Sequence, residues 1–383
     1  MTFQEFCCLL LILTFTIYGF IILAFTIGLI NKLHRPHLRT NQHTRFVSVI
    51  IPVRNEENNI LRILEEIRGQ DFPIECLEVI VTNDYSEDAT MTLANHFANQ
   101  YPAFPLIMVS ATHTETDAPG KKHAIKRAVS KAKGEILLFT DADTSRGPGW
   151  ILSMVSCFGS SGIQMVFGPV HYCNEKNLLQ KIQSLEFMGL MGITAGSAAI
   201  GHPVMCNGAN LAYRREAFLQ TGGFSKNIRY RSGDDQFLMS AIRKQFGKMS
   251  LVFNGDPLAT VSTEPESTLA GFFNQRIRWV SKSPGYRDPV VILVGFVTYL
   301  THLLLLAGML SGFAFSTFLF FSLVLWFIKI LIEFPMVWIM IRFFGKKKLT
   351  GYYFIAQVFQ LAYVPLAGMM GLFLPYRWKG RKG

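Results

Sequence analysis

The sequence predicts a mostly parallel α/β domain with transmembrane helices before and after it. Strand-like and helix-like stretches alternate between residues 46 and 140, and long apolar runs flank the region 46–283. Alternating strands and helices build a parallel sheet covered by helices on both faces. Because 50% of the 383 residues are hydrophobic and only 16% are charged, part of the chain must lie in lipid.

Three apolar runs, at 7–30, 290–340 and 353–374, are candidates for membrane helices. About 20 apolar residues cross the hydrocarbon core, so the first run provides one helix, the second two and the third one more. The first run has no basic region before it and no small-residue cleavage site, which favours an uncleaved anchor over a signal peptide. The chain is therefore predicted to be a multi-pass integral membrane protein.

Basic residues beside the first run predict its orientation. Four cations follow it and none precedes it: Lys32, Arg35, Arg39 and Arg45. The positive-inside rule then places the central domain in the cytoplasm and the amino terminus outside. Two crossings in the second run bring the chain back inside, so a crossing by the third would leave the basic tail outside. Either the third run is re-entrant or interfacial, or the count before it is wrong.

The net charge of +11 comes largely from basic clusters at 276–287, 346–348 and 377–382, beside the apolar runs. Such clusters suit the anionic lipids of a cytoplasmic leaflet. Basic residues interleaved with aromatics, which nucleic-acid binding would require, are not found in the central region, so no nucleic-acid partner is expected. The six cysteines show no zinc-type spacing, which fits a reducing compartment.

The chain divides into four expected regions: an anchor and basic linker at 1–45, the sheet domain at 46–266, an amphipathic interfacial segment at 267–288, and a membrane region with a basic tail at 289–383. Within the sheet domain the expected strands are 46–52, 77–82, 105–110 and 135–140. The expected helices are 58–67, 121–132 and one capped by Ser86 that runs to residue 100. Ligands of such sheets bind beyond the carboxyl ends of the strands.

Polar clusters follow three of these strand ends: Arg54, Asn55 and Glu56; Asn83 and Asp84; Asp141 and Asp143. Asn, Asp and Ser are common in turns, so any one cluster alone indicates only a solvated loop. Three clusters at the same sheet edge predict a binding site.

Asp141 and Asp143 leave the apolar strand 136–139 at its open end. Carboxylate oxygens are the ligands that Mg²⁺ or Mn²⁺ prefers, and such an ion is usually held by one or two carboxylates together with substrate phosphates. The sequence therefore predicts a divalent-metal site at these two residues.

Asp234 and Asp235 open a predicted helix, where acidic residues often serve only to cap the helix dipole. We nevertheless predict Asp235 as a general base, because a carboxylate within hydrogen-bond reach can deprotonate an attacking hydroxyl. Asn207 and Gly208 follow a long apolar segment at 178–200 and predict a tight turn near an acceptor. Lys121 precedes a helix and could reach a phosphate, although a lysine exposed on the surface is the commoner outcome.

An amphipathic stretch at 269–281 carries Gln275, Arg276, Arg278 and Trp279 just before the second apolar run. Arginine matches phosphate oxygens and an indole can cover a site, although anchoring at the membrane interface would select the same residues. Farther on, Lys329 and Glu333 lie four residues apart inside an apolar run, so they share a helix face and are expected to pair.

The motifs that carry this pattern occur in a fixed order: Pro52-x-Arg54-Asn55-Glu56, Asn83-Asp84-x-Ser86-x-Asp88, Gly120-Lys121, Asp141-x-Asp143, Asp234-Asp235 and Gln275-x-x-Arg278-Trp279. Over residues 46–283 this order resembles the inverting GT-A glycosyltransferases related to cellulose, chitin and hyaluronan synthases and to ceramide glucosyltransferase. The combined order is far more specific than any single motif.

The resemblance implies a GT-A fold and a role for each motif. Residues implied to bind a nucleotide diphosphate sugar, with UDP as the expected nucleotide, are Pro52, Arg54, Glu56, Asp84, Lys121, Asp141, Gln275, Arg278 and Trp279. Asp143, helped by Asp141, would bind Mg²⁺ or Mn²⁺, and Asp235 would be the catalytic base. Asn207, Gly208 and Asp234 would bind the acceptor. The chain departs from the family pattern at Asn83, where Asp is frequent, and at Gly233-Asp234, which replaces a more usual Thr-Glu.

Single sugar transfer to a lipid or lipid-linked acceptor is the favoured activity, because about four membrane segments are few for a polymer-conducting pore. A processive polysaccharide synthase, acting as a homo-oligomer, is the alternative. A nucleotidyltransferase would need a glycine-rich phosphate loop, and residues 53–59 contain no glycine. A non-enzymatic membrane scaffold gives no reason for these motifs to occur in this order.

Overall fold

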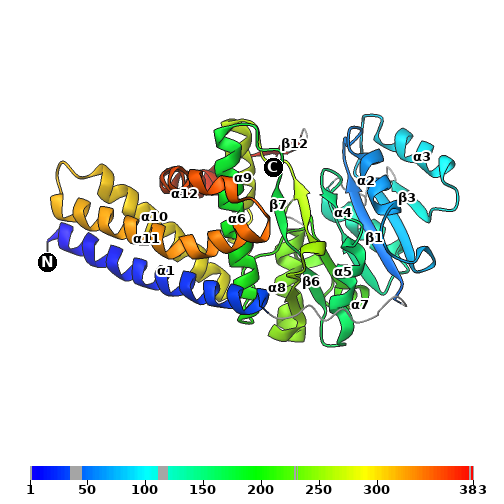
Figure 1. Ribbon diagram of the computed structural model, residues 1–383, viewed down its shortest axis with the longest axis horizontal. Helices are drawn as coiled ribbons and strands as arrows, with labels where there is room; N and C mark the ends of the chain where they lie inside the picture. The colour runs from blue at the N-terminus through cyan, green and yellow to red at the C-terminus, as the bar shows by residue number, and fades with distance from the viewer. Residues whose placement is uncertain are drawn as a thin grey trace.

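The computed structural model describes residues 2–34, 45–110, 120–227, 230, 232–378 and 381–382. Arg35 and Arg39 of the predicted orientation signal lie outside these residues, as do the side chains of the basic tail. The described chain forms a seven-stranded sheet domain joined to a bundle of long helices (Figure 1). The six cysteines are free thiols.

The sheet has the strand order β3-β2-β1-β4-β8-β6-β9. Its first half is parallel, as predicted, and consists of β3 (Leu106–Ser110), β2 (Leu77–Asn83), β1 (Val47–Val53) and β4 (Ile136–Phe139). In the second half β8 (Leu211–Arg214) runs antiparallel to both β4 and β6 (Met165–Phe167), and β6 pairs in parallel with β9 (Leu251–Phe253). The parallel half therefore brings the carboxyl ends of β1, β2 and β4 to one edge.

Helices cover both faces of the sheet. One face packs on α2 (Ile60–Arg68), α3 (Thr90–Gln100) and α5 (Trp150–Ser156). The other packs on α4 (Lys121–Lys131), α6 (Leu178–Ala199) and α8 (Asp234–Phe246). This second apolar core continues through α6 to residues of the membrane helices, so the domain and the bundle share one core. Smaller elements are α7 (Arg215–Gln220) and a three-stranded sheet of β5 (Ser145–Arg146), β10 (Val261–Thr263) and β7 (Val170–Tyr172).

The prediction that Ser86 caps a helix is wrong. α3 begins at Thr90, and the Ser86 hydroxyl accepts a hydrogen bond from the backbone N–H of Asn55 at 3.1 Å, while the backbone N–H of Ser86 donates to the Asn83 side chain at 2.9 Å. Ser, Asn and Asp side chains compete for backbone groups in loops as readily as at helix ends. Here they tie the loop after β2 to the loop after β1.

The described residues contain four helices long and apolar enough to cross a membrane, as predicted: α1 (Phe3–Leu33), α10 (Pro289–Leu310), α11 (Ser316–Phe343) and α12 (Tyr353–Phe373). α1, α10 and α11 lie side by side and extend away from the sheet domain, whereas α12 lies nearer the domain, beside α9 (Leu269–Val280) (Figure 1).

Both ends of α12 lie on the side of the sheet domain. Just before α12, Lys346 forms an ion pair with Glu175 at 2.5 Å and Tyr352 receives a hydrogen bond from Lys181 at 3.1 Å. Just after it, Tyr376 lines the same cavity as the Asp234-Asp235 pair. The hairpin of β11 (Arg377–Trp378) and β12 (Arg381–Lys382) therefore stays near the domain (Figure 1).

A polar cluster lies inside the helix bundle. Lys329 and Glu333 of α11 form the expected ion pair at 2.8 Å. Lys329 also donates to the side chains of Gln357 and Gln360 on α12, each at 2.8 Å, and Glu333 accepts hydrogen bonds from Gln357 at 2.8 Å and from Tyr18 of α1. The cluster therefore joins α1, α11 and α12, because each buried charge obtains its partners from other helices.

We expect Lys329→Met or Glu333→Leu alone to destabilise the protein by about 3 kcal/mol, because each change leaves one buried charge without its partner. The double variant removes both charges and should recover most of that loss. Thermal unfolding in detergent measures the difference. If the double variant is no more stable than the singles, the two residues are not energetically coupled.

Candidate active site

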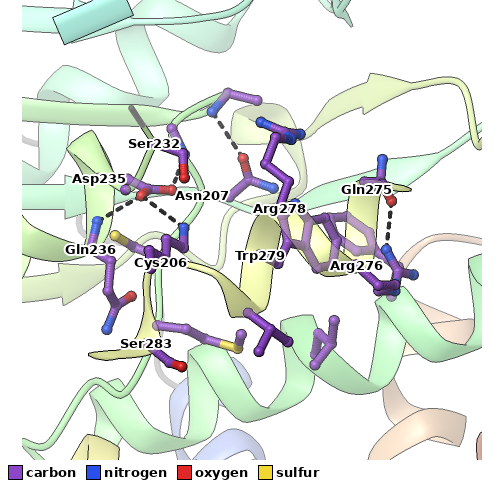
Figure 2. Close-up of a pocket in the computed structure, with 18 of the residues that line it drawn as sticks. Cys206, Asn207, Ser232, Asp235, Gln236, Gln275, Arg276, Arg278, Trp279 and Ser283 are labelled. Atoms are coloured by element: carbon purple, nitrogen blue, oxygen red, sulfur yellow. Dashed lines mark hydrogen bonds and ion pairs between the residues drawn. The ribbon is translucent and has the colours of Figure 1, made fainter. Parts of the chain in front are cut away.

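One cavity of about 1100 Å³ opens where the sheet edge meets α6, α9, α10 and α12. It is lined by every residue to which the sequence assigns a catalytic, metal-binding, donor-binding or acceptor-binding role, whereas Asn55 and Asn83 of the polar clusters do not line it. The lining residues with an assigned role are Pro52, Arg54, Glu56, Asp84, Lys121, Asp141, Asp143, Asn207, Gly208, Asp234, Asp235, Gln275, Arg278 and Trp279. Figure 2 shows Asp235 and Gln236 on one side of this pocket, Gln275 and Arg276 on the other, and Arg278 and Trp279 between them. Residues from distant segments thus meet in one place.

The loops after β1 and β2 form one wall of the cavity. Arg54 is 9% exposed, and its guanidinium donates to the backbone carbonyls of Asp84 and Tyr85, both at 3.0 Å. The Asp84 carboxylate accepts a hydrogen bond at 2.7 Å from the backbone N–H of Gly120. Gly120 has a φ of 145°, a conformation that side chains disfavour, so glycine permits this turn into α4.

Asp141 and Asp143 follow β4, as predicted. Asp143 is exposed, and Asp141 is partly exposed and lies 2.6 Å from the Lys121 ammonium group. The same ammonium group is 3.9 Å from Asp234. Lys121 therefore links the acidic loop after β4 with the acidic start of α8. Burial lowers the pKa of Lys121, but the charges of Asp141 and Asp234 outweigh burial and raise it above its usual range.

A divalent cation fits the oxygen donors on this side of the cavity. Among the described residues no three His, Cys, Asp or Glu side chains form a closed metal cluster. Two carboxylates facing a cavity match the pattern in which Mg²⁺ or Mn²⁺ takes its remaining ligands from substrate phosphates and water.

Asp235 is held from three directions. Its carboxylate accepts hydrogen bonds from the backbone N–H groups of Gly208 at 3.1 Å and Gln236 at 2.7 Å, and the Lys282 ammonium group lies 3.6 Å away. Burial alone would raise the pKa of Asp235; Lys282 and the two N–H donors together lower it. These contacts hold Asp235 ionised, the form that accepts a proton.

Its neighbour Asp234 behaves in the opposite way. Burial raises the pKa of Asp234, and the negative charges of Asp235 and Asp141 raise it further, against the attraction of Lys121. Two adjacent carboxylates in nearly the same site thus differ in pKa, because Asp235 lies nearer Lys282 and accepts two backbone N–H hydrogen bonds, whereas Asp234 is raised by the charges of Asp235 and Asp141. Asp235 is the better placed of the two to act as a base.

We expect Lys282→Met to move the acid limb of the activity profile to higher pH. The positive charge of Lys282 lowers the pKa of Asp235, whereas burial raises it. Without that charge the pKa of Asp235 rises, so Asp235 becomes protonated at a higher pH than in the wild type. The measurement is kcat against pH, with Lys282→Arg as the charge-preserving control. An unchanged acid limb in Lys282→Met would show that Asp235 is not the titrating group.

α9 carries the Gln-x-x-Arg-Trp motif along the cavity. Arg276, which directly follows Gln275 of the motif, is buried. Arg276 forms an ion pair with Glu186 of α6, and its guanidinium lies 4.2 Å from the centre of the Trp279 ring and 4.5 Å from that of Phe272. Glu186 also accepts a hydrogen bond from Tyr363 of α12. Arg276 thus connects Trp279 to Glu186 of α6, and Glu186 connects α6 to α12.

The interpretation of the basic cluster 276–287 as facing the leaflet is wrong for Arg276 and Lys282. Arg276 is 4% exposed, and the side chain of Lys282 is 16% exposed and points to Asp235. Lys282 and Glu186 are site residues that the sequence did not indicate. Near Lys282 in the sequence, the only sign of a site was Trp279, three residues before it. Its partner Asp235 lies 47 residues away in the chain, so the ion pair could not be predicted from neighbouring residues.

Comparison with known proteins is consistent with this geometry. A glycosyltransferase from Haloferax volcanii, AglE, is 32% identical over 127 residues, which are 33% of this chain and 40% of that protein. A poly-β-1,6-N-acetyl-D-glucosamine synthase from Staphylococcus epidermidis is 21% identical over 372 residues, 90% of this chain and 86% of the synthase. The chain spans only 40% and 56% of two curated relatives that it matches.

A solved mannosyltransferase from Pyrobaculum calidifontis, in complex with GDP-Man and Mn²⁺, superimposes over 96% of this chain and 99% of its own, with a TM-score of 0.64 and 18% identity. At that identity the likeness shows the GT-A fold, which confirms the predicted fold class. The model of glycosyl transferase family 21 matches residues 10–380, nearly the whole chain. The chain therefore belongs to glycosyl transferase family 21.

Proposed function

We propose that the protein is a metal-dependent, inverting glycosyltransferase that moves a sugar from a nucleotide diphosphate, with UDP as the expected nucleotide, to a hydroxyl of a lipid or lipid-linked acceptor. One observation carries this proposal. The carboxylates after β4, the carboxylate at the start of α8 and the Gln-x-x-Arg-Trp motif of α9 line a single cavity, which continues between two helices of the bundle.

In this proposal the acceptor oxygen attacks the anomeric carbon while its proton passes to Asp235. The bond between that carbon and the diphosphate oxygen breaks, and the nucleoside diphosphate leaves. Lys121 and Arg278 supply positive charge to the phosphates, and Arg276 holds Trp279 in place beside them. Attack opposite the leaving group inverts the anomeric configuration.

Asp141 and Asp143 would hold Mg²⁺ or Mn²⁺. When bound, the ion supplies positive charge that offsets the charge developing on the departing diphosphate. Asp84, Arg54, Glu56 and Pro52 form the wall assigned to the nucleotide, and Asn207, Gly208 and Asp234 the wall assigned to the acceptor.

Purified protein in lipid, incubated with labelled nucleotide sugars and either Mg²⁺ or Mn²⁺, tests the proposal. The expected products are a nucleoside diphosphate and a glycosylated molecule that extracts with lipid, in equal amounts. Release of pyrophosphate would identify a nucleotidyltransferase instead. No turnover with any donor would refute transferase activity for this chain.

A processive synthase remains a second candidate, because the chain aligns with the poly-N-acetylglucosamine synthase over nearly its full length. The product length separates the two. A single added sugar, measured by mass spectrometry, supports transfer to a lipid, whereas a ladder of sugar lengths supports a polysaccharide synthase.

We further propose that α1, α10 and α11 cross the membrane and that α12 lies along the interface, with the domain and the tail both in the cytoplasm. This arrangement follows from both ends of α12 lying at the sheet domain. In a cysteine-free background, an impermeant maleimide should label Ser311→Cys in intact cells, and Thr350→Cys and Lys382→Cys only after permeabilisation. Labelling of Lys382→Cys in intact cells would show that α12 crosses.

A further inference from the structure

We infer that the groove between α10 and α12 binds the hydrocarbon chain of the acceptor, and that Gly295 sets how much of the chain the groove takes. This inference rests on the proposed function and adds the place of the acceptor's apolar part. It starts from a single cavity, whose lining includes both Asp235 and residues of the helix segments 291–299 and 363–372.

The walls of the groove are uncharged. The segments 291–299 of α10 and 363–372 of α12 contain no Asp, Glu, Lys or Arg. A sugar polymer would need polar donors and acceptors along the whole path, whereas the lining residues of these segments other than Thr298, Tyr299 and Tyr363 are apolar. A hydrocarbon chain gains by contact with such apolar walls. The uncharged walls therefore favour the chain of a lipid as the occupant.

The groove opens sideways, toward the surroundings of the helix bundle. Ile292, Phe296 and Leu372 line the cavity and are nevertheless 48%, 60% and 54% exposed. Because α10 is one of the candidate membrane helices, this exposed side faces the lipid in the proposed arrangement. A lipid can then enter laterally and present its hydroxyl to Asp235 without leaving the bilayer.

The floor of the groove lies where the two helices touch. A Cβ added at Gly368 would lie 2.4 Å from the Tyr299 ring, so α12 can approach α10 this closely only with glycine there. From Val291 to Tyr299 the helix rises about 12 Å, at 1.5 Å per residue, which sets the depth of the groove.

Gly295 lies between the mouth and the floor. A Cβ added there would meet no atom within 4 Å, so the space beside Gly295 is open. A Cβ at this position disturbs no neighbour, and a larger side chain would shorten or close the groove. Leu293, on the same helix, is 50% exposed and lies outside the cavity lining, which makes it a matched control.

The test uses the full-length protein in detergent and hexadecanol with a photoreactive diazirine in its chain. In the wild type, cross-links should concentrate on peptides covering 291–299 and 363–372. The series Gly295→Ala, Gly295→Leu and Gly295→Trp should lose this labelling progressively, by at least about tenfold for Trp, whereas Leu293→Trp should retain it. Equal labelling in all Gly295 variants would overturn the inference, and so would an equal loss in Leu293→Trp.

A second measurement separates this inference from the proposed function. With the lipid acceptor found in the transfer assay, Gly295→Leu should raise KM at least about tenfold and leave donor hydrolysis by water unchanged. If the wild type transfers no sugar but the labelling follows Gly295, the groove stands and the proposed function fails. If transfer occurs with the same KM in Gly295→Leu, the proposed function stands and the inference fails.

Discussion

Asp235→Asn should lower the rate of sugar transfer by about 10²–10⁴-fold, the usual contribution of a general base. The amide keeps the size of the side chain and its place at the start of α8, but it cannot accept the acceptor's proton. Donor binding should be almost unchanged, because Asp235 lies beside Gly208 and Lys282, on the side of the cavity that we propose for the acceptor. The measurements are single-turnover transfer and nucleotide-sugar affinity by calorimetry.

Asp71→Asn is the matched control, since Asp71 is exposed and does not line the cavity. It should transfer sugar at the wild-type rate. Transfer at the wild-type rate by Asp235→Asn as well would reject the assignment of the base. A loss of donor affinity equal to the loss of rate would instead place Asp235 in the donor site.

Asp143→Asn should weaken binding of the divalent cation by at least about 100-fold, because loss of even an outer-shell partner of a metal costs 10–100-fold. The side chain is exposed at the end of β4 and lines the cavity together with Asp141, outside the apolar core. Transfer at a fixed low metal concentration should fall by a similar factor. Titration of the Mn²⁺ spectrum by electron paramagnetic resonance measures binding independently of activity.

Asp141→Asn provides the comparison for this variant. Asp141 also forms an ion pair with Lys121. Asp141→Asn should therefore weaken binding of the metal ion and also remove this ion pair. A high metal concentration should therefore restore sugar transfer more fully in Asp143→Asn than in Asp141→Asn. Normal Mn²⁺ binding by both variants would show that the metal site lies elsewhere.

Local sequence patterns predicted the parallel half of the main sheet, but not β6, β8 and β9 of its other half. β1, β2, β3 and β4 begin and end within a residue or two of the expected strands, because apolar runs bounded by polar turns are set by neighbouring residues. The polar clusters after these strands could also be predicted to meet, since parallel strands end at a common edge. The ion pair of Lys329 and Glu333 could be predicted because residues four apart lie on the same face of a helix.

Contacts between distant segments could not be predicted in this way. A basic cluster beside an apolar run has the same composition whether it faces lipid headgroups or a buried carboxylate, and only folding showed that Arg276 meets Glu186 and Lys282 meets Asp235. Likewise Ser86 is a residue type that often caps helices, but its hydroxyl accepts a hydrogen bond from the backbone N–H of Asn55 in another loop.

The sequence by itself determined the α/β domain, the four apolar helices and the order of the acidic and Gln-x-x-Arg-Trp motifs, because strand alternation, helix periodicity and hydrophobic length are properties of consecutive residues. The tertiary structure decided that both ends of α12 lie at the domain, that Lys282 helps to lower the pKa of Asp235, and that the cavity extends between α10 and α12. These features depend on which side chains meet across the fold, and burial and charge act through space rather than along the chain.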